Sequence, residues 1–286
     1  MRIHRKTTVA LCCLLALLCA RTVSATVADG DKLMEEGKFK KAIGQYEEAL
    51  KHQPDNGQLL VKLARAYDHD GWYGRSFETW EKYLEKFPEG EHLEEAKKRA
   101  SMARRWVAVK KYGMGEAVPP VIEHLEKAIE LDPKNFEARY WLGRVYFENG
   151  KFEKAIPVLE KALDIKPGDR NTQWLISQAT GALEHGGEAY DLYVKAYPLY
   201  EKGKLEEALD LYKQSAAANP EFVNPVIWIA RINMEMGNYD RAIEYWREVV
   251  SMDPENDRAK WFMIKSGQLK TEKEKEQKEK EESTGD

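Results

Sequence analysis

Prolines recur in this sequence at a fixed spacing, and this spacing limits the possible folds more than any other feature. Three pairs are each separated by 34 residues: Pro54 and Pro88, Pro133 and Pro167, Pro220 and Pro254. Each proline follows an amphipathic stretch that carries Ala or Leu. A period of about 20 to 50 residues indicates a repeat architecture, in which one unit is too small to bury its apolar face alone.

The clearest copy of the repeat runs from residue 136 to residue 167. Its diagnostic positions are, in chain order, Leu142, Gly143, Tyr146, Gly150, Ala155, Ala162 and Pro167. This pattern resembles the tetratricopeptide repeat family, in which each repeat is a hairpin of two antiparallel helices. Small residues suit the closest approach of the helices, a central glycine permits the turn, and proline ends the second helix.

Four other copies keep the register, and they end at Pro54, Pro88, Pro220 and Pro254. A further, less regular unit ends at Pro133. We therefore predict an all-α fold, an α-α superhelical solenoid of about six helical hairpins with capping helices.

Two longer proline spacings interrupt the period. Between Pro88 and Pro133 the spacing is 45 residues, and we expect one long helix over 91–111. Between Pro167 and Pro220 it is 53 residues, and we expect an extra helix over 172–183. That helix is predicted to cap a first block, 26–184, before the flexible pair Gly186-Gly187 and a second block, 188–270. A continuous solenoid with one insertion is the alternative.

The end of the chain is expected to contain a capping helix and a charged tail. The helix is predicted over 257–269, where Trp261, Phe262 and Ile264 supply apolar surface. The stretch 271–282 has no apolar residue, so we predict a disordered tail over 271–286. A solvated helix held by i,i+4 ion pairs is the alternative.

The first 25 residues have the pattern of an export signal. A cationic start precedes an apolar run over 9–20, and small residues lead to a predicted cleavage after Ala25. The run is too short to span a bilayer, which needs about 20 residues. Lipid attachment is disfavoured, because no small residue precedes any of the three cysteines. These cysteines all lie before Ala25, so the mature, periplasmic or secreted chain is expected to form no disulfide.

The charge balance and the histidine positions argue against several classes of function. Lys and Arg number 45 against 49 Asp and Glu, which argues against nucleic-acid binding and against adhesion to an anionic membrane. We expect no stable membrane insertion once the signal is removed. Asp68 opens a calcium-like sequence, but Thr79 stands where that loop requires an acid. We find no catalytic or metal-binding pattern and expect no enzyme and no cofactor.

The resemblance implies a partner-binding face along the first helix of each repeat. Alignment of the repeats places the following residues on this face: Val61, Arg65, Asp68, His69, Tyr140, Arg144, Phe147, Glu148, Tyr190, Tyr193, Tyr197, Tyr200, Ile227, Arg231 and Met234. The three arginines occupy one equivalent position. They would either grip carboxylates and carbonyls of a peptide or pair with neighbouring acids. The four tyrosines share one side of a helix, as a ligand platform or as packing.

These features predict a non-catalytic scaffold or adaptor that binds a protein or peptide partner in the bacterial cell envelope. The segment 75–96 is similar to repeats of envelope proteins that coordinate outer-membrane assembly and cell division. Two alternatives stay open. One is an accessory role in cell-wall, polysaccharide or outer-membrane assembly, and the other is a structural array formed by self-association.

Overall fold

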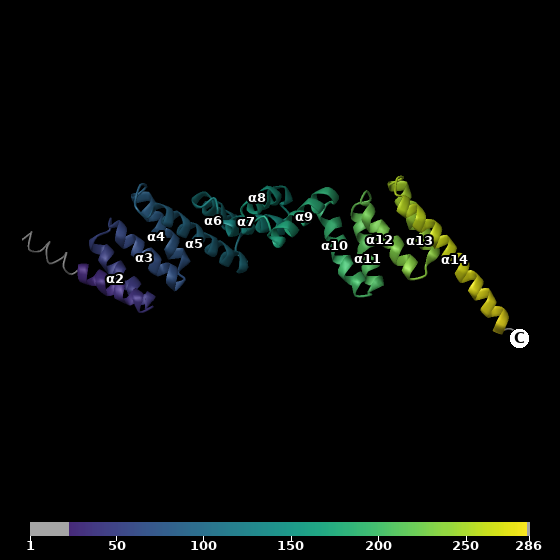
Figure 1. Cartoon of the computed structure of the whole chain (residues 1–286), viewed down its shortest axis with the longest axis horizontal. Coiled ribbons are helices and arrows are strands. Elements are labelled where there is room, and N and C mark those ends of the chain that lie inside the picture. Colours follow the sequence, from purple (N-terminus) through teal and green to yellow (C-terminus); the bar gives the residue numbers. More distant parts are fainter. Residues whose placement is uncertain (1–22, 285–286) are drawn as a thin grey trace, which may run out of the picture. The chain divides into compact units, whose positions relative to one another are not determined.

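The computed structural model describes residues 23–284, and within this range it contains helices and no strand (Figure 1). A helix over residues 23–35 is followed by α2 Phe39–His52, α3 Gly57–Asp70, α4 Tyr73–Lys86, α5 Leu93–Gly113, α6 Val118–Leu131, α7 Phe136–Glu148, α8 Phe152–Ile165, α9 Arg170–His185, α10 Gly187–Glu201, α11 Leu205–Ala218, α12 Val223–Glu235, α13 Tyr239–Met252 and α14 Asp257–Thr284. The predicted all-α fold class is confirmed.

Short polar side chains two residues after several prolines begin the next helix. Asn56 follows Pro54, and its Oδ1 accepts a hydrogen bond from the backbone N–H of Leu59 at 3.2 Å. The same N-terminal cap is formed by Asn135, Asp169 and Asn256. Each cap pairs a backbone N–H that has no partner inside its helix. The proline and the capping residue together fix where one hairpin ends and the next begins.

The turn inside each hairpin contains a glycine with positive φ: Gly37, Gly71, Gly115, Gly150, Gly203 and Gly237. At Gly71, φ is 76° and the N–H bonds to the carbonyl of Asp68, while the N–H of Trp72 bonds to that of Tyr67. Side chains with a Cβ are strained in this left-handed conformation, so glycine is the residue that lets the chain reverse within two positions.

Small side chains lie where the paired helices approach most closely. Ala42, Ser76, Ala155, Ala208 and Ala242 open the second helix of their hairpins, and all are fully buried. The approach is close at Gly143 of α7, where a Cβ would lie 2.4 Å from Cγ of Leu159 on α8. These positions are the ones that carry the family resemblance in the sequence.

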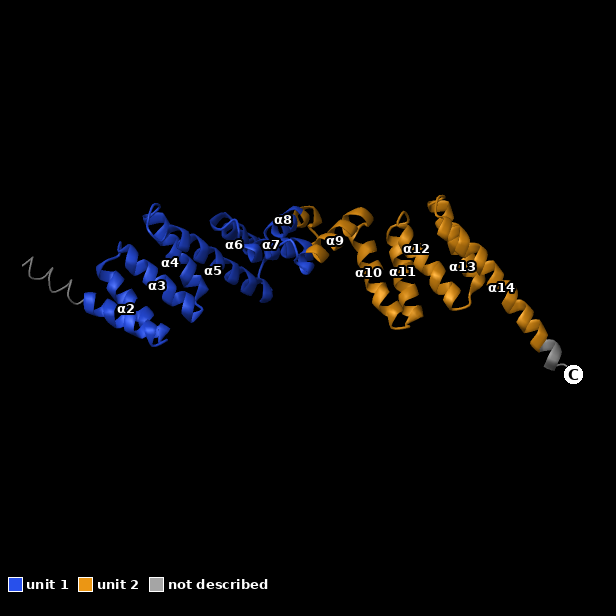
Figure 2. Ribbon diagram, viewed as in Figure 1, with its two compact units in different colours: residues 1–149, 157–172 blue, residues 150–156, 173–286 orange. Residues whose placement is uncertain are grey.

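The chain divides into two compact units, which Figure 2 colours separately. Within the described range, unit 1 comprises residues 23–149 and 157–172, and unit 2 comprises residues 150–156 and 173–284. The largest fully buried side chain of unit 1 is Trp80, which packs with Leu60 and Val61. In unit 2 the central cluster contains Tyr212, Ile229 and Ile232.

Helix α9 corresponds to the extra helix expected after Pro167, but from residue 173 onward it belongs to unit 2. The ring of His185 at its end stacks on the buried ring of Phe222 at 3.9 Å. Asn219 Nδ2 also donates a hydrogen bond to the carbonyl of His185 at 2.8 Å. The end of this helix thus packs within the second block, and the cap that we expected on the first block stays a prediction. The boundary at 185–187 stays a prediction.

Two further helices differ in length from the regular repeat. The long helix expected over 91–111 is α5, with 21 residues where α3 has 14. At the C-terminal end, residues 271–284 continue α14, whereas we expected a disordered tail there. Lysines and glutamates alternate at helical spacing in this stretch, and Lys270 approaches Glu274 at 3.9 Å. The structure therefore agrees with the solvated-helix alternative for these residues.

Candidate functional site

Arg65 is the first of the three register-equivalent arginines, and an acid of a neighbouring helix binds it. Its Nε and Nη2 donate to the two carboxylate oxygens of Glu95 on α5, at 2.9 and 2.5 Å. This bidentate pair raises the pKa of Arg65 and lowers the pKa of Glu95. The geometry agrees with the alternative in which the arginine pairs with a neighbouring acid, and not with an arginine that is free to bind a ligand.

Val61 does not lie on an accessible face. We expected it to contact a partner, but it is buried in the cluster that also contains Ala96 and Ala100 of α5. Helix α5 covers this part of α3, so the register transfer is wrong at Val61. Asp68, three residues after Arg65 along the same helix face, is likewise largely buried.

Arg144, in unit 1, belongs to a compact polar and aromatic group. Its Nε donates to Oε1 of Glu148 at 2.6 Å, and its guanidinium lies 4.9 Å from the ring centre of Trp141. The hydroxyl of Tyr112 on α5 donates to the other carboxylate oxygen of Glu148 at 2.5 Å. Burial and this carboxylate raise the pKa of Tyr112 to about 12.

Unit 2 repeats this arrangement around Arg231. Its Nε donates to Oε1 of Glu235 at 3.2 Å, and its guanidinium lies 5.0 Å from the ring centre of Trp228. Tyr200 of α10 donates its hydroxyl proton to Glu235 at 2.8 Å. One arrangement of four residue types, Trp, Arg, Glu and Tyr, therefore occurs in both units. In each unit it joins the first helices of two consecutive hairpins.

The four tyrosines of α10 fall into two classes. Tyr190 and Tyr193 pack on Phe222, at 6.3 and 5.0 Å between ring centres, and so serve mainly as packing residues. Tyr197 and Tyr200 instead lie edge-on to Trp228, at 5.5 and 4.8 Å. Tyr197 is 44% exposed. Of the four rings, Tyr197 is the exposed one, and the other three are half-buried.

Tyr140 and Phe147, the other predicted partner-binding residues, are half-buried on α7 in unit 1. Tyr140 stacks on Phe136 at 6.1 Å, so part of its ring already packs within its own helix. The partner-binding role of the whole predicted set stays a prediction.

A cleft of about 350 Å³ in unit 2 adjoins the aromatic group. It is lined by Ile227, Trp228, Arg231, Trp246, Asn256, Arg258, Ala259 and Phe262. Trp246 is almost fully buried, and its Nε1–H has no hydrogen-bond partner among the described residues. Arg231 and Arg258 supply hydrogen-bond donors to the lining, while Trp228 and Phe262 give it apolar walls. Such a lining favours groups that accept hydrogen bonds.

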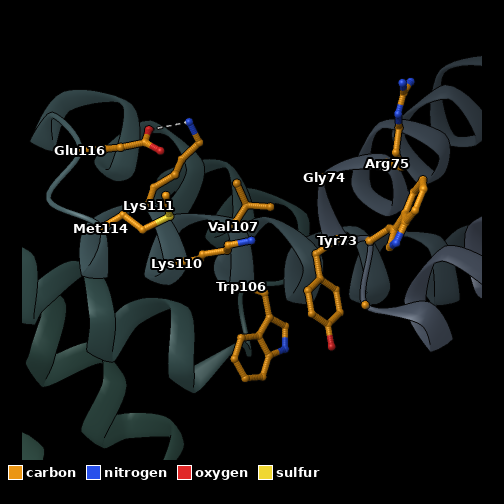
Figure 3. A pocket seen from close by; sticks show the side chains of 11 residues that line it. Tyr73, Gly74, Arg75, Trp106, Val107, Lys110, Lys111, Met114 and Glu116 are labelled. Carbon is orange, nitrogen blue, oxygen red and sulfur yellow. Dashed lines mark hydrogen bonds and ion pairs between the residues drawn. The ribbon is translucent and has the colours of Figure 1, made fainter.

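A second cleft, of about 520 Å³, lies in unit 1, and the sequence patterns did not predict it (Figure 3). It lies between residues 71–75, which form the α3–α4 turn and the start of α4, and residues 106–114 at the end of α5 and its C-terminal cap. The sequence signal that could have revealed it is the 45-residue proline spacing, because the added residues lengthen α5. Insertions in repeat proteins often form the binding face.

The calcium-like sequence at Asp68 is a structural element of the second hairpin. Its carboxylate accepts hydrogen bonds from Ser76 Oγ and from Trp80 Nε1. Across residues 23–284 no group of three or more His, Cys, Asp or Glu side chains is placed to hold a metal ion. Over the same range no helix is both long and apolar enough to cross a membrane.

Paired helices with glycine turns, small interhelical residues and proline ends define a helical-repeat protein. The family model of the tetratricopeptide repeat matches residues 33–73, 117–179 and 199–266. The chain therefore belongs to the tetratricopeptide repeat family. Proteins of this family mediate protein–protein interaction, and the repeat is in general not catalytic.

Curated relatives and solved structures share this repeat at low identity. The peroxisomal targeting signal receptor of Kluyveromyces lactis is 25% identical over 219 residues, which cover 75% of this chain and 33% of the receptor. Stress-induced-phosphoprotein 1 of Caenorhabditis elegans is 30% identical over 150 residues, 46% of each protein. The chain thus spans a third to a half of these relatives. A tetratricopeptide repeat protein from Parabacteroides merdae is similar in structure, with 13% identity, 86% coverage of this chain, 99% of that chain and a TM-score of 0.41.

Proposed function

We propose that this protein is an exported, non-catalytic adaptor that binds an extended peptide segment of a protein partner through the first helices of unit 2. The observation that carries the proposal is the cleft beside Trp228, where Arg231 and Arg258 present hydrogen-bond donors. An extended peptide offers backbone carbonyls at regular intervals, together with side chains that fit between aromatic rings. Arg231 keeps Glu235 as an internal partner, whereas Arg258 has no ion pair within residues 23–284 and is the cation of this lining that a ligand can engage.

Tyr197 extends the proposed binding face from the cleft onto α10. Its ring is exposed and meets the edge of Trp228, which also lines the cleft. Aromatic side chains combine large contact area with little loss of conformational freedom and are enriched in interface hot spots. We therefore place the centre of the interface at Trp228, between Tyr197 and Arg258.

The test is site-specific photocrosslinking with the full-length protein. A photoreactive phenylalanine analogue replaces Tyr197 in one variant and Tyr245, on α13, in a control. In cell-envelope extract of the source organism, we expect a defined crosslinked partner from position 197, lost when Trp228→Ala and Arg258→Ala are added. Equal products from both positions, or a product insensitive to these changes, would contradict the proposed interface.

The export part of the proposal rests on sequence alone. Residues 1–22 lie outside the described range, and the expected cleavage after Ala25 falls inside the helix over 23–35. Cleavage there removes Val23, which is buried against Ala49 and Leu59. The apolar run and the small residues before Ala25 support export to a periplasm or to the exterior, and the segment 75–96 supports an envelope role.

Self-association is a second candidate function, favoured by one observation on α14. Trp261 and Ile264 lie one turn apart on this helix, and both are more than half exposed. Terminal repeats of a solenoid normally need a polar outer face to stay soluble. Light scattering of wild type and a Trp261→Ser, Ile264→Ser variant distinguishes the alternatives. A dimer in the wild type and a monomer in the variant would support self-association. A wild type that is monomeric at all concentrations would contradict it.

A further inference from the structure

The cleft of unit 1 exists because α5 is longer than the other first helices. The hairpin of α3 and α4 turns at Gly71 and Trp72, and the last turns of α5 run alongside this turn. Where α4 meets α5, the rings of Tyr73 and Trp106 stack, with 5.5 Å between the ring centres and an interplanar angle of 9°. Figure 3 shows these two rings side by side, with Lys110, Lys111 and Met114 further along α5.

Large apolar side chains are unusually exposed around this pair. Trp72 is 48% exposed, Trp106 is 42% exposed and Met114 is 68% exposed. A smaller hollow of about 160 Å³ shares Tyr73 and Trp106 and adds the exposed Met102. Contiguous exposed apolar surface of this kind marks interaction sites in soluble proteins. Methionine adds a flexible, polarizable wall that adapts to different apolar side chains.

The charges at the edge of the cleft are predominantly basic. Arg75, Lys110 and Lys111 line it, and Glu116 is the one acid in the lining. Glu116 is already paired with Lys111 at 2.9 Å, and Lys110 has no ion pair among the described residues. Arg75 makes only a long contact of 3.9 Å to Glu78, and both side chains are well exposed. The chain as a whole carries a net charge of −4, so this basic edge is a local feature.

We propose that this cleft is a second binding site, for an acidic peptide segment that carries one large apolar side chain. The apolar side chain lies between Trp72, Trp106 and Met114, and flanking carboxylates reach Lys110 and Arg75. The site is separate from the cleft beside Trp228, and it does not depend on the function proposed above. It gives the adaptor a specificity that combines charge with one apolar anchor.

A peptide fits this lining better than an anionic polysaccharide does. The walls consist of indole rings, a phenol ring, methionine and Val107, which favour an aliphatic or aromatic side chain. Sugar hydroxyls need hydrogen-bond acceptors as well as donors, and the carboxylate of Glu116 is engaged with Lys111. An acidic polypeptide offers both the apolar group and the carboxylates within a few residues.

The probe is a fluorescent synthetic peptide with blocked ends, in which one leucine is flanked by glutamates. Binding to the full-length protein is followed by fluorescence anisotropy. We expect saturable binding that weakens about tenfold or more when the glutamates become lysines or the leucine becomes serine. Raising the salt concentration should weaken binding of the acidic peptide as well, because these charges are exposed.

Protein variants locate the binding site. Trp106→Ala and Lys110→Glu should each weaken binding about tenfold or more, whereas Trp261→Ala and Lys278→Glu, exposed in unit 2, should leave it unchanged. Circular dichroism checks that each variant is folded. The proposal is overturned if the lysine peptide binds as well as the glutamate peptide, if Trp106→Ala binds normally, or if an acidic polysaccharide binds the cleft and the peptide does not. Loss of the Trp228 interface would leave this result unaffected.

Discussion

The indole Nε1 of Trp80 donates a hydrogen bond to Oδ2 of Asp68 at 3.1 Å, inside the core where Trp80 is fully buried. Ser76 Oγ donates to the other oxygen of the same carboxylate, and Arg99 approaches it at 3.4 Å. One side chain of α3 thus joins α4 and α5. A carboxylate with three internal partners is a structural element of the hairpin stack, although its sequence context resembles a cation-binding loop.

Replacing Asp68 should therefore destabilise unit 1. In Asp68→Ala the indole N–H and the Ser76 hydroxyl lose their buried acceptor, which costs about 1–3 kcal/mol. Urea denaturation measures the change. The control is Asp55→Ala, which removes an exposed ion pair with Lys86 and should change the free energy of unfolding by less than about 1 kcal/mol. Equal effects of the two substitutions would contradict the role assigned to Asp68.

Gly143→Ala tests the close approach of α7 and α8. The added methyl group would meet Leu159 at 2.4 Å, so we expect a loss of about 1–3 kcal/mol from overpacking. Gly44→Ala on α2 is the matched control, because no atom lies within 4 Å of the place its methyl group would take and alanine favours the helix by about 0.5–1 kcal/mol. Thermal unfolding should show opposite signs for the two variants. If both stabilise the protein, the helix contact is looser than described.

His124 should make unit 1 less stable in mild acid. Burial lowers its pKa, and the nearby Arg104, whose Nη1 lies 3.3 Å from Nδ1, lowers it further. A depressed folded pKa means that the unfolded chain takes up the proton first. The neutral form of His124 therefore contributes its full stability to the folded state above about pH 6.5. This contribution is lost as the pH falls through the pKa of His124 in the folded protein.

The measurement is the unfolding midpoint in urea at pH 7.5 and pH 5.5, compared with His124→Phe. Phenylalanine keeps a ring against Phe77, which His124 contacts edge-on at 5.6 Å, but it does not titrate. We expect the variant to lose less stability between the two pH values than the wild type. An identical pH dependence would show that other groups control it.

Export predicts a mature chain that begins at Thr26. Expression of the full chain in a bacterium, followed by fractionation and intact-mass measurement, should give a periplasmic product without the first 25 residues. Ala25→Arg should block cleavage, because the peptidase site requires a small residue. A full-length product that stays in the cytoplasm would contradict the signal assignment.

The sequence predicted the hairpins well because their determinants are local. Proline removes a backbone donor wherever it stands, and a glycine such as Gly150 adopts positive φ without a steric penalty. The 34-residue spacing therefore places helix ends and turns without knowledge of what packs against them. The long α5 was also predictable, because the 45-residue spacing between Pro88 and Pro133 leaves room for a longer helix than the 34-residue period does.

The accessible faces were predicted less well, because exposure depends on the neighbouring helix. Val61 and Arg65 lie on one face of α3 in the sequence pattern, yet α5 buries the first and pairs the second with Glu95. The tyrosines of α10 look equivalent in the sequence, but Phe222 covers Tyr190 and Tyr193 and leaves Tyr197 exposed.

The sequence by itself thus determined the repeat, its turns and its helix ends, since each rests on the conformational limits of one or two residues. Only the tertiary structure decided which side chains are free to meet a partner. The clefts beside Trp228 and Trp106 are formed by residues far apart in the chain, and the cleft at Trp106 also depends on how far α5 extends past the α3–α4 turn. Periodicity within a single helix does not contain that information.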